Sequence, residues 1–276
     1  MVRRVLVNGG LGNQMFQYAF YLSLKAKGLE CCFDNSLFEY ANKMHQGYEL
    51  ESVFGISETT CRQSPLHGFI VRVLYKYKPQ RIVFCDKPYM YCQDAYASNA
   101  RYYSGCWIHP SYFAGIEDYV REAFQFKNVS EKNLDFLKDL ATVNTVSLHI
   151  RRGDYLKNPI YGVCDENFHS SAINWINERV ESPIFIVFSD DVEWCNEYLK
   201  QFNINYRMVD WNKGKNSYQD MFLMSQCKHN IIANSTFSWW GAWLNTNKNK
   251  IVVAPNRWTT NNQMDYSLPQ WVFVEF

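Results

Sequence analysis

The chain has 276 residues, which fits one large domain or two halves of roughly 130 residues each. Its formal net charge is +1, from 28 basic and 27 acidic side chains, so the charge of the whole chain gives no reason to expect nucleic acid or an anionic membrane as the main partner. Nine cysteines at irregular spacing, without a C-x-x-C pair, argue against a zinc knuckle or a disulfide framework and favour reduced thiols.

The N-terminal stretch MVRRVLVNGGLGNQ lacks the apolar segment of a signal peptide, and no run of about 18 apolar residues occurs anywhere in the chain. The sequence therefore predicts a cytoplasmic protein without a transmembrane helix. Aromatic residues make up 17% of the chain, which suits both core packing and contact with sugar rings.

The first predicted elements are a strand, a glycine turn and a helix. Residues 3–8 form a short apolar run, Gly9, Gly10 and Gly12 follow, and apolar residues then recur at helical spacing over residues 15–27. This order is typical of the start of an α/β domain. The next signals are weaker, and residues 36–80 resist assignment. We expect strands at 30–34 and 81–85 and helices at 111–126 and 130–141.

The second half alternates regularly between strand and helix patterns, which predicts a parallel sheet covered by helices on both faces. We place the boundary between an N-terminal unit, residues 1–135, and a C-terminal unit, residues 136–276, in a stretch rich in Lys, Asn and Ser. The expected strands are 143–150, 184–188, 204–209, 230–233 and 251–254, and the expected helices are 166–181, 191–202, 217–227 and 236–246.

Polar residues follow these apolar strands, at the positions where an open parallel sheet binds its ligands. Arg151 and Arg152 come directly after one strand, and the Ser/Thr-rich segment Asn234-Ser235-Thr236 comes after another and begins a helix. Arginines bind phosphate oxygens bidentately, and the first turn of a helix offers backbone N–H groups to anions. The combination predicts a site for an anion, most simply a diphosphate. Each feature alone also fits an ordinary Arg–Asp pair or a helix cap.

Two further segments have competing interpretations. The glycine-rich segment around Gly10 and Gly12 matches a dinucleotide-binding fingerprint imperfectly, because Met15 stands in place of its third small residue. Asp220 lies three residues after Ser217, as in a capping box, but its carboxylate could instead accept two hydrogen bonds from guanine. The chain contains no D-x-D triplet, so we expect arginine and a helix N-terminus, rather than a metal ion, to neutralise phosphate charge.

Three stretches of the sequence belong together: GGLGNQMFQYA from Gly9 to Ala19, HIRRGDY from His149 to Tyr155, and NSTFSWWG from Asn234 to Gly241. In their order and spacing, the chain resembles the bacterial α-1,2-fucosyltransferases, glycosyltransferase family 11. The resemblance implies a GT-B-like α/β fold of two Rossmann-like halves with parallel sheets. The C-terminal half would bind GDP-fucose and the N-terminal half would serve the acceptor. Fucose would pass with inversion to a hydroxyl, O2 by resemblance, of a galactose-containing glycan, with no obligatory metal or other cofactor.

The resemblance also assigns expected roles to residues. Arg151 would hold the β-phosphate with Arg152 beside it, and His149 would contact the guanosine. Asp220 would bind guanine, and Ser235, Thr236 and Ser238 would form the phosphate loop. In the glycine-rich segment, Gly10 and Gly12 would approach the donor, and Asn13 and Gln14 would approach fucose and acceptor. An acceptor joined to lipid would bring the enzyme to the inner face of the membrane.

The general base that inversion requires stays open at this point. Asn13 stands near where some relatives place a carboxylate, and an amide is not an ordinary base. Asp154 is the nearest acidic residue in a motif, although it could merely orient an arginine. A phosphate oxygen of GDP is the third option.

Three alternatives to this function remain. The glycine turn would also suit a dinucleotide-dependent oxidoreductase, although Met15 argues against it. The aromatic content would also suit a non-catalytic glycan-binding protein, although such proteins are expected to be all-β. A fucosyltransferase of another linkage is the third, because the linkage comes entirely from resemblance.

Overall fold

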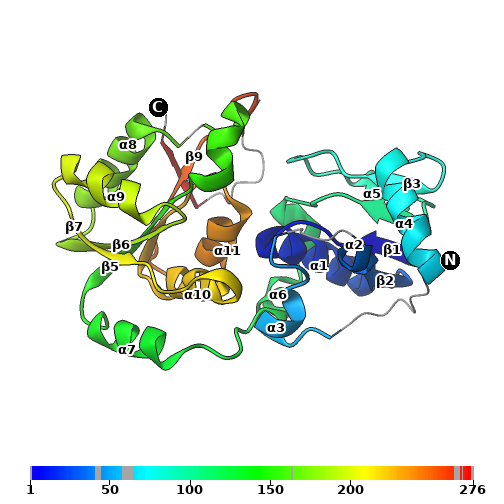
Figure 1. Cartoon of the computed structure of the whole chain (residues 1–276), viewed down its shortest axis with the longest axis horizontal. Coiled ribbons are helices and arrows are strands. Elements are labelled where there is room, and N and C mark those ends of the chain that lie inside the picture. Colours follow the sequence, from blue (N-terminus) through cyan, green and yellow to red (C-terminus); the bar gives the residue numbers. More distant parts are fainter. Residues whose placement is uncertain are drawn as a thin grey trace. The chain divides into compact units, whose positions relative to one another are not determined.

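A computed structural model describes residues 2–40, 45–57, 65–162, 164–263, 268 and 270–274. The chain forms two compact units, and the first ends at Lys127 (Figure 1). This division is earlier than the boundary at 135/136 expected from the sequence. The reason is that helix α7 (Glu131–Asp139) packs with α10 (Tyr218–Gln226) and so belongs to the second unit.

The first unit is built on a parallel sheet of four strands in the order β2-β1-β4-β3. Helix α1 (Leu11–Ala26) follows β1 directly, and its side chains from Met15 to Leu24 are buried. The strands are β1 (Arg3–Leu6), β2 (Cys31–Asp34), β3 (Val83–Cys85) and β4 (Tyr102–Ser104); the other helices are α2 (Ser36–Tyr40), α3 (Leu50–Phe54), α4 (Pro65–Tyr77), α5 (Asp94–Ala97), η1 (Pro110–Phe113) and α6 (Glu117–Ala123).

The second unit is built on a parallel sheet of six strands in the order β12-β9-β8-β5-β6-β7. Its strands are β5 (Asn144–Ile150), β6 (Pro183–Ser189), β7 (Asn205–Val209), β8 (His229–Ile231), β9 (Val252–Pro255) and β12 (Val272–Val274). A small antiparallel pair, β10 (Arg257–Thr259) and β11 (Asn262–Gln263), lies outside this sheet.

Helices cover both faces of the six-stranded sheet, with α8 and α9 on one side of β5 and β6 and α10 and α11 on the other (Figure 1). Alternate residues of β6 therefore enter two different apolar cores, because successive strand side chains point to opposite faces. Phe185 packs in the core under α8 and Ile186 in the core under α10. The helices are α8 (Glu166–Asn177), α9 (Val192–Tyr198) and α11 (Thr236–Leu244), with short 3₁₀ turns η2 (Gly153–Lys157), η3 (Pro159–Tyr161), η4 (Leu199–Gln201) and η5 (Gly214–Asn216).

The expected α/β class with two Rossmann-like halves is confirmed, because each unit contains a parallel sheet, whereas the GT-B-like arrangement of the halves stays a prediction. No helix in the described part of the chain has both the length and the apolar character needed to cross a membrane. Among the described residues, seven cysteines are free thiols and Cys32 is disulfide-bonded, so the expectation of reduced cysteines holds for most of them but not for Cys32.

Candidate active site

The strand order of the second unit identifies where a ligand would bind. From β5 the chain proceeds outward through β6 and β7, and it then returns to place β8 on the other side of β5. In a doubly wound sheet this reversal opens a crevice at the carboxyl ends of the two central strands. Arg151 directly follows β5, and Asn234 and Ser235 follow β8. Two of the three segments singled out in the sequence therefore lie at this reversal of the strand order.

Arg151 is positioned by a carboxylate from the neighbouring strand. Asp190 follows β6, and its Oδ2 lies 2.8 Å from Nη1 of Arg151. Its Oδ1 accepts hydrogen bonds from the backbone N–H groups of Arg152, at 2.9 Å, and of Gly153, at 3.2 Å. A Cβ on Gly153 would lie 2.3 Å from Asp190 Oδ2, so glycine permits this close approach. The side chain of Arg151 remains 31% exposed and accessible to an anion.

Arg152 is held in a different direction. Its Nε donates to Asp191 Oδ2 at 3.0 Å, and its guanidinium carbon lies 3.5 Å from the centre of the Trp194 ring. Asp191 also caps α9 by accepting from the Trp194 amide at 3.3 Å. Asp190 and Asp191, which the sequence analysis did not include among the site residues, thus each brace one arginine. The side chain of Asp154, the expected brace or base, lies outside the described part of the structure.

The loop after β5 is tied to the loop after β8. The hydroxyl of Tyr155 donates to the carbonyl oxygen of Asn234 at 2.9 Å. The Asn234 amide group in turn donates to the carbonyl oxygens of Tyr161, at 3.1 Å, and Trp258, at 2.8 Å. Asn234 therefore fixes the geometry of both loops, which fits a pre-formed site.

Helix α11 begins beside these loops with the expected Ser and Thr residues. Ser235 is the N-cap, and its hydroxyl accepts from the Phe237 amide at 3.4 Å. Ser238 is buried and donates to the carbonyl oxygens of Ala233 and Ser235. Thr236, the first residue of the helix, is partly exposed. The two serine hydroxyls are thus engaged within the protein, and the partial positive charge of the helix N-terminus is the feature that suits an anion.

His149 lies on β5 and is buried, with its ring 6.1 Å from that of Phe237 in α11. Burial lowers its pKa to about 3, and the charges of Arg151 and His169 act in the same direction. The imidazole is therefore neutral near pH 7. Its Nδ1 has no hydrogen-bond partner within the described residues. This position matches the sequence-based alternative of a packed core histidine, and any contact with guanosine stays a prediction.

Asp220 lies in the first turn of α10, and the capping box proposed from its spacing is absent. The N-cap residue, Ser217, makes no side-chain cap hydrogen bond. Instead, Asp220 Oδ1 accepts from the amide of Asn212 at 2.9 Å. Burial raises the pKa of Asp220 to about 7, and the hydrogen bond from Asn212 opposes this increase. A carboxyl group with this pKa is poised to gain or lose a proton when a ligand binds.

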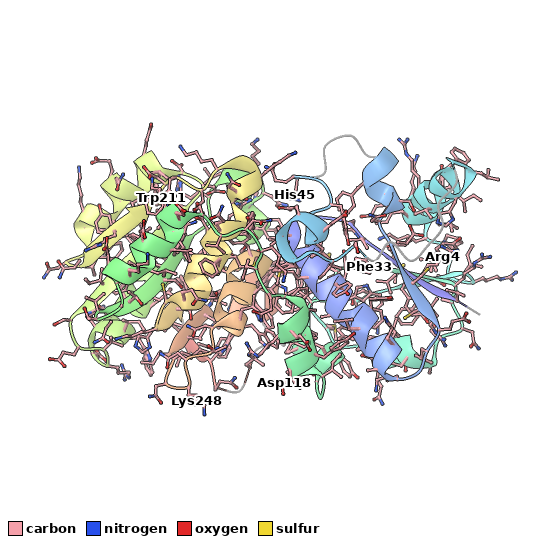
Figure 2. The ribbon with its side chains drawn as sticks, turned by 90° about the horizontal axis from the view of Figure 1, so that it is seen from below. Arg4, Phe33, His45, Asp118, Trp211 and Lys248 are labelled. Carbon is pink, nitrogen blue, oxygen red and sulfur yellow. The ribbon has the colours of Figure 1, made fainter. Side chains whose placement is uncertain are left out.

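A buried network of amide side chains contacts Asp220 through Asn212. Asn133 on α7 donates to Asn212 Oδ1 at 3.0 Å and to Gln219 Oε1 at 2.6 Å, and it accepts from the indole of Trp211 at 2.7 Å (Trp211 is labelled in Figure 2). No sequence pattern predicts this network, because its members are scattered from residue 133 to residue 219. The network fixes the start of α10 and with it the direction of the Asp220 side chain.

The glycine-rich segment of the first unit is mostly helix rather than loop. Gly10 is the N-cap of α1, so Gly12, Asn13 and Gln14 fall in its first turn. Gly9 has a φ of +78°, and a Cβ there would lie 2.8 Å from Asn13 Nδ2. Asn13 is partly exposed. The helix thus begins four residues earlier than the expected range 15–27.

Gln14 is fully buried, and its side chain joins two backbone segments. Its amide group donates to the carbonyl oxygens of Gly9 and Gly47, each at 2.9 Å, and its oxygen accepts from the Glu49 amide at 2.9 Å. This arrangement differs from the expected contact with sugar, because the hydrogen bonds of Gln14 would have to break.

Glu49 is a buried acidic residue that the sequence analysis did not single out. Burial raises the pKa of Glu49 to about 7, and a hydrogen bond from the Leu11 amide partly opposes this increase.

Gln17 forms a second clamp in the same unit. Its oxygen accepts from the Asn8 amide at 3.1 Å, just after β1, and its amide donates to the carbonyl oxygen of Gly105 at 2.9 Å, just after β4. Since β1 and β4 are neighbours, Gln17 holds together the carboxyl ends of the two central strands. These clamps explain why polar residues lie on the buried face of α1.

The geometry defines an α/β protein that presents arginine and a helix N-terminus to an anion. The family model for glycosyl transferase family 11 matches residues 2–275, and the chain belongs to that family. It is 35% identical to an α-1,2-colitosyltransferase of Escherichia coli over 97% of both chains. It is also 35% identical to the O-antigen biosynthesis glycosyltransferase WbnK of Escherichia coli, over 96% of this chain and 98% of that one.

A human galactoside α-(1,2)-fucosyltransferase 1 is 26% identical over 87% of this chain and 64% of its own length. The protein is therefore a glycosyltransferase homologous to α-1,2-fucosyltransferases. Membership of this family argues against the oxidoreductase and the non-catalytic glycan-binding alternatives. Among solved structures, the fucosyltransferase NodZ from Bradyrhizobium aligns over 87% of this chain and 91% of its own, with 12% identity and a TM-score of 0.48.

Proposed function

We propose that this glycosyltransferase moves L-fucose from GDP-β-L-fucose to O2 of a terminal β-galactoside, with inversion to an α-fucoside. One observation carries the proposal: an accessible arginine, Arg151, is fixed by Asp190 at the carboxyl end of β5, at the reversal of the strand order. A diphosphate leaving group develops negative charge as the bond to fucose breaks. A pre-oriented guanidinium stabilises that charge without reorganising.

Asp220 would select the base of the donor. Guanine presents an N1–H and an exocyclic N–H₂ on one edge, and a carboxylate accepts from both. Adenine has no donor at N1 and would leave one carboxylate oxygen without a partner. The hydrogen bond from the Asn212 amide to Asp220 Oδ1 restricts rotation of this carboxylate, which supports the proposal.

Charge neutralisation by Arg151 and by the N-terminus of α11 supports catalysis without a metal ion. Among the described residues, no group of three His, Cys, Asp or Glu side chains is arranged to hold a metal. Metal independence remains part of the proposal, and an assay in EDTA tests it. The general base is not assigned. The options are Asp154 and a phosphate oxygen of GDP, and Asn13 would contact the acceptor.

One relative of this chain favours an alternative proposal with a different donor sugar. The α-1,2-colitosyltransferase of Escherichia coli shares 35% identity over nearly its whole length, and colitose is fucose without the 3-hydroxyl group. A site that hydrogen-bonds the 3-hydroxyl of fucose would reject colitose strongly, because a buried polar group would lose its partner. The alternative is therefore transfer of colitose from GDP-colitose to the same class of acceptor.

The test compares GDP release from GDP-fucose and from GDP-colitose, in EDTA, with and without a panel of β-galactosides. Mass and linkage analysis of the product follows. Acceptor-dependent release with a gain of one fucose at O2 supports the proposal, and faster turnover of GDP-colitose replaces it with the alternative. Another linkage would correct the acceptor position, and turnover that EDTA abolishes would refute metal independence. If neither donor is turned over and GDP does not bind, the assignment of the donor site is wrong.

A further inference from the structure

Helix α4 in the first unit is apolar on two faces, although a helix on a protein surface normally has one. Its inner face packs into the core: Val71 and Leu74 are buried against Leu6, Val83 and Tyr102. This face accounts for the attachment of the helix to the sheet. It does not account for the apolar residues on the opposite side.

The outer face of α4 carries large apolar side chains in the open. Leu66, Phe69 and Tyr77 have exposed fractions of 68%, 63% and 68%, and Ile70 and Val73 are also exposed. These positions follow the spacing i, i+3, i+4, i+7 and i+11, which places them on one continuous stripe. Exposed apolar residues scattered singly are ordinary, whereas a contiguous stripe marks an interaction surface.

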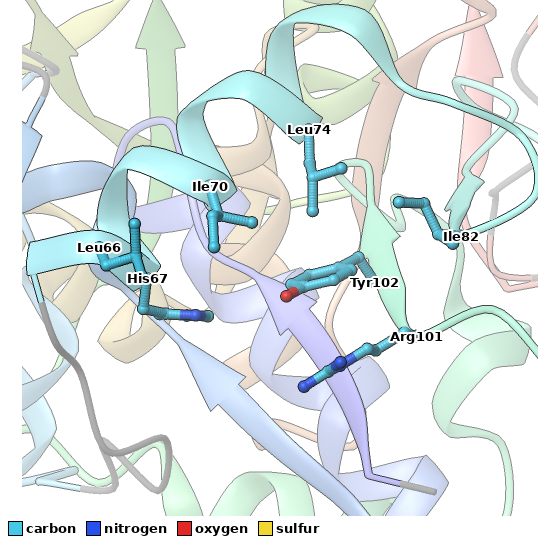
Figure 3. Close-up of a pocket in the computed structure, with 7 residues that line it drawn as sticks. All are labelled: Leu66, His67, Ile70, Leu74, Ile82, Arg101 and Tyr102. Carbon is cyan, nitrogen blue, oxygen red and sulfur yellow. The ribbon is translucent and has the colours of Figure 1, made fainter.

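A shallow cavity of about 350 Å³ lies beside this stripe, between α4 and the residues at the start of β3 and β4. Figure 3 shows Ile70 and Leu74 of α4 pointing toward Tyr102, with the guanidinium of Arg101 along the other side. The cavity therefore extends the apolar surface inward and places a positive charge at its border.

The charged residues of α4 and of the segment that follows it all have one sign. From residue 65 to residue 85 the sequence contains Arg72, Lys76, Lys78 and Arg81 and no acidic residue. All four basic side chains are exposed. An amphipathic helix that combines Leu, Phe and Ile with Lys and Arg is typical of a segment that lies in a membrane interface, with its apolar side chains among the acyl chains. The net charge of +1 for the whole chain conceals this local excess.

We propose that the exposed face of α4 binds the surface of a membrane containing anionic phospholipid. The apolar stripe enters the interface, and the basic residues pair with lipid phosphates. This inference is independent of the donor and acceptor of the proposed reaction, because it rests on a surface of the first unit alone. It would place the enzyme where an acceptor joined to lipid is found.

The test is flotation of the full-length chain with vesicles of phosphatidylcholine, with and without phosphatidylglycerol. We expect binding only when phosphatidylglycerol is present, and weaker binding at high salt because salt screens the pairing. Lys76→Gln should weaken binding roughly fivefold, the effect of one basic residue at an anionic surface. Phe69→Asp should weaken it roughly tenfold or more, because its ring no longer enters the apolar layer.

The controls are Leu134→Asp, which places an acid at an exposed leucine of α7, and Lys248→Gln, at an exposed lysine labelled in Figure 2. Both should bind vesicles like the unaltered chain, and thermal unfolding verifies that each variant is folded. If Phe69→Asp does not fold, the Lys76→Gln variant and the salt dependence of binding test the proposal in its place. No binding to phosphatidylglycerol vesicles, or equal losses in the controls, would overturn the proposal. Analytical ultracentrifugation could instead show a dimer that Phe69→Asp dissociates. That result would also overturn the proposal, because a second copy of the chain would then cover this face.

Discussion

At the scale of single residues, the Arg151–Asp190 pair makes the sharpest prediction. Arg151→Ala should lower kcat/KM, because the activation barrier should rise by about 2–4 kcal/mol when one electrostatic donor to a leaving group is lost. Asp190→Asn should lower kcat less, because it keeps the arginine but loosens its position. Steady-state kinetics of the two variants measures both effects. Near-normal activity of Arg151→Ala would remove the arginine from the mechanism.

Asp220 predicts how GDP affinity depends on pH. Burial raises its pKa to about 7, and guanine requires the ionised form, so binding of GDP releases a proton below that pH. Affinity should therefore fall about tenfold per pH unit below pH 7 and level off above it. Calorimetric titration from acid to alkaline pH measures this slope. Asp220→Asn should bind weakly at every pH, whereas the exposed Asp210→Asn should behave like the unaltered chain. A slope retained in Asp220→Asn would assign the proton to another group.

His149 predicts a loss of stability in acid. Its pKa in the folded protein is about 3, lowered by burial from an ordinary value of 6.5. Below pH 6.5 the unfolded chain therefore binds a proton that the folded chain does not, and stability falls as the pH falls toward 3. The contribution is at most about 1.4 kcal/mol per pH unit. Urea unfolding at neutral and mildly acid pH should show a smaller loss in His149→Leu than in the unaltered chain. Equal losses would mean that His149 does not titrate in this way.

At the scale of elements, the turn before α1 makes a prediction with a matched control. Gly9 and Gly28 both have positive φ, at +78° and +71°, but only at Gly9 would a Cβ meet a neighbour, Asn13. Each change to Ala should cost about 1–3 kcal/mol of stability through the backbone. Only Gly9→Ala should also displace Asn13, and so reduce turnover if Asn13 contacts substrate. Unfolding and kinetic measurements on both variants separate the two effects, and equal activities would argue against a role for Asn13.

The predictability of an element followed its length and the number of its apolar faces. The central strands β5 and β6 were expected almost at their observed bounds, because long strands buried on both sides appear as continuous apolar runs. Strand β4 has only three residues and gave no signal. Helix α4 fell in the unassigned range 36–80, although its exposed apolar residues recur at helical spacing.

At the scale of the whole molecule, the sequence identified the segments of the site but not the contacts between them. Arg151 and Ser235 could be placed at strand ends, and the observed order of strands brings those ends together. The partnership of Asp190 with Arg151 depends on β6 lying beside β5, which alternation of strands and helices alone does not determine. The bracing of Asp220 by Asn212 and Asn133 depends on packing of α7 against α10, which is equally invisible in the sequence.

The last prediction concerns which unit binds the donor. A ligand at a hundred times its Kd stabilises the folded state by about 2.7 kcal/mol, so GDP should raise the unfolding temperature of the chain. Hydrogen exchange should localise the protection to the second unit, at the loop after β5 and the first turns of α10 and α11, because GDP would shield the amides around Arg151, Asp220 and Ser235. Asp220→Asn should lose the thermal shift at the same GDP concentration. Protection confined to the first unit, around Gly10, would transfer the nucleotide site to that unit and reverse the assigned roles of the two halves.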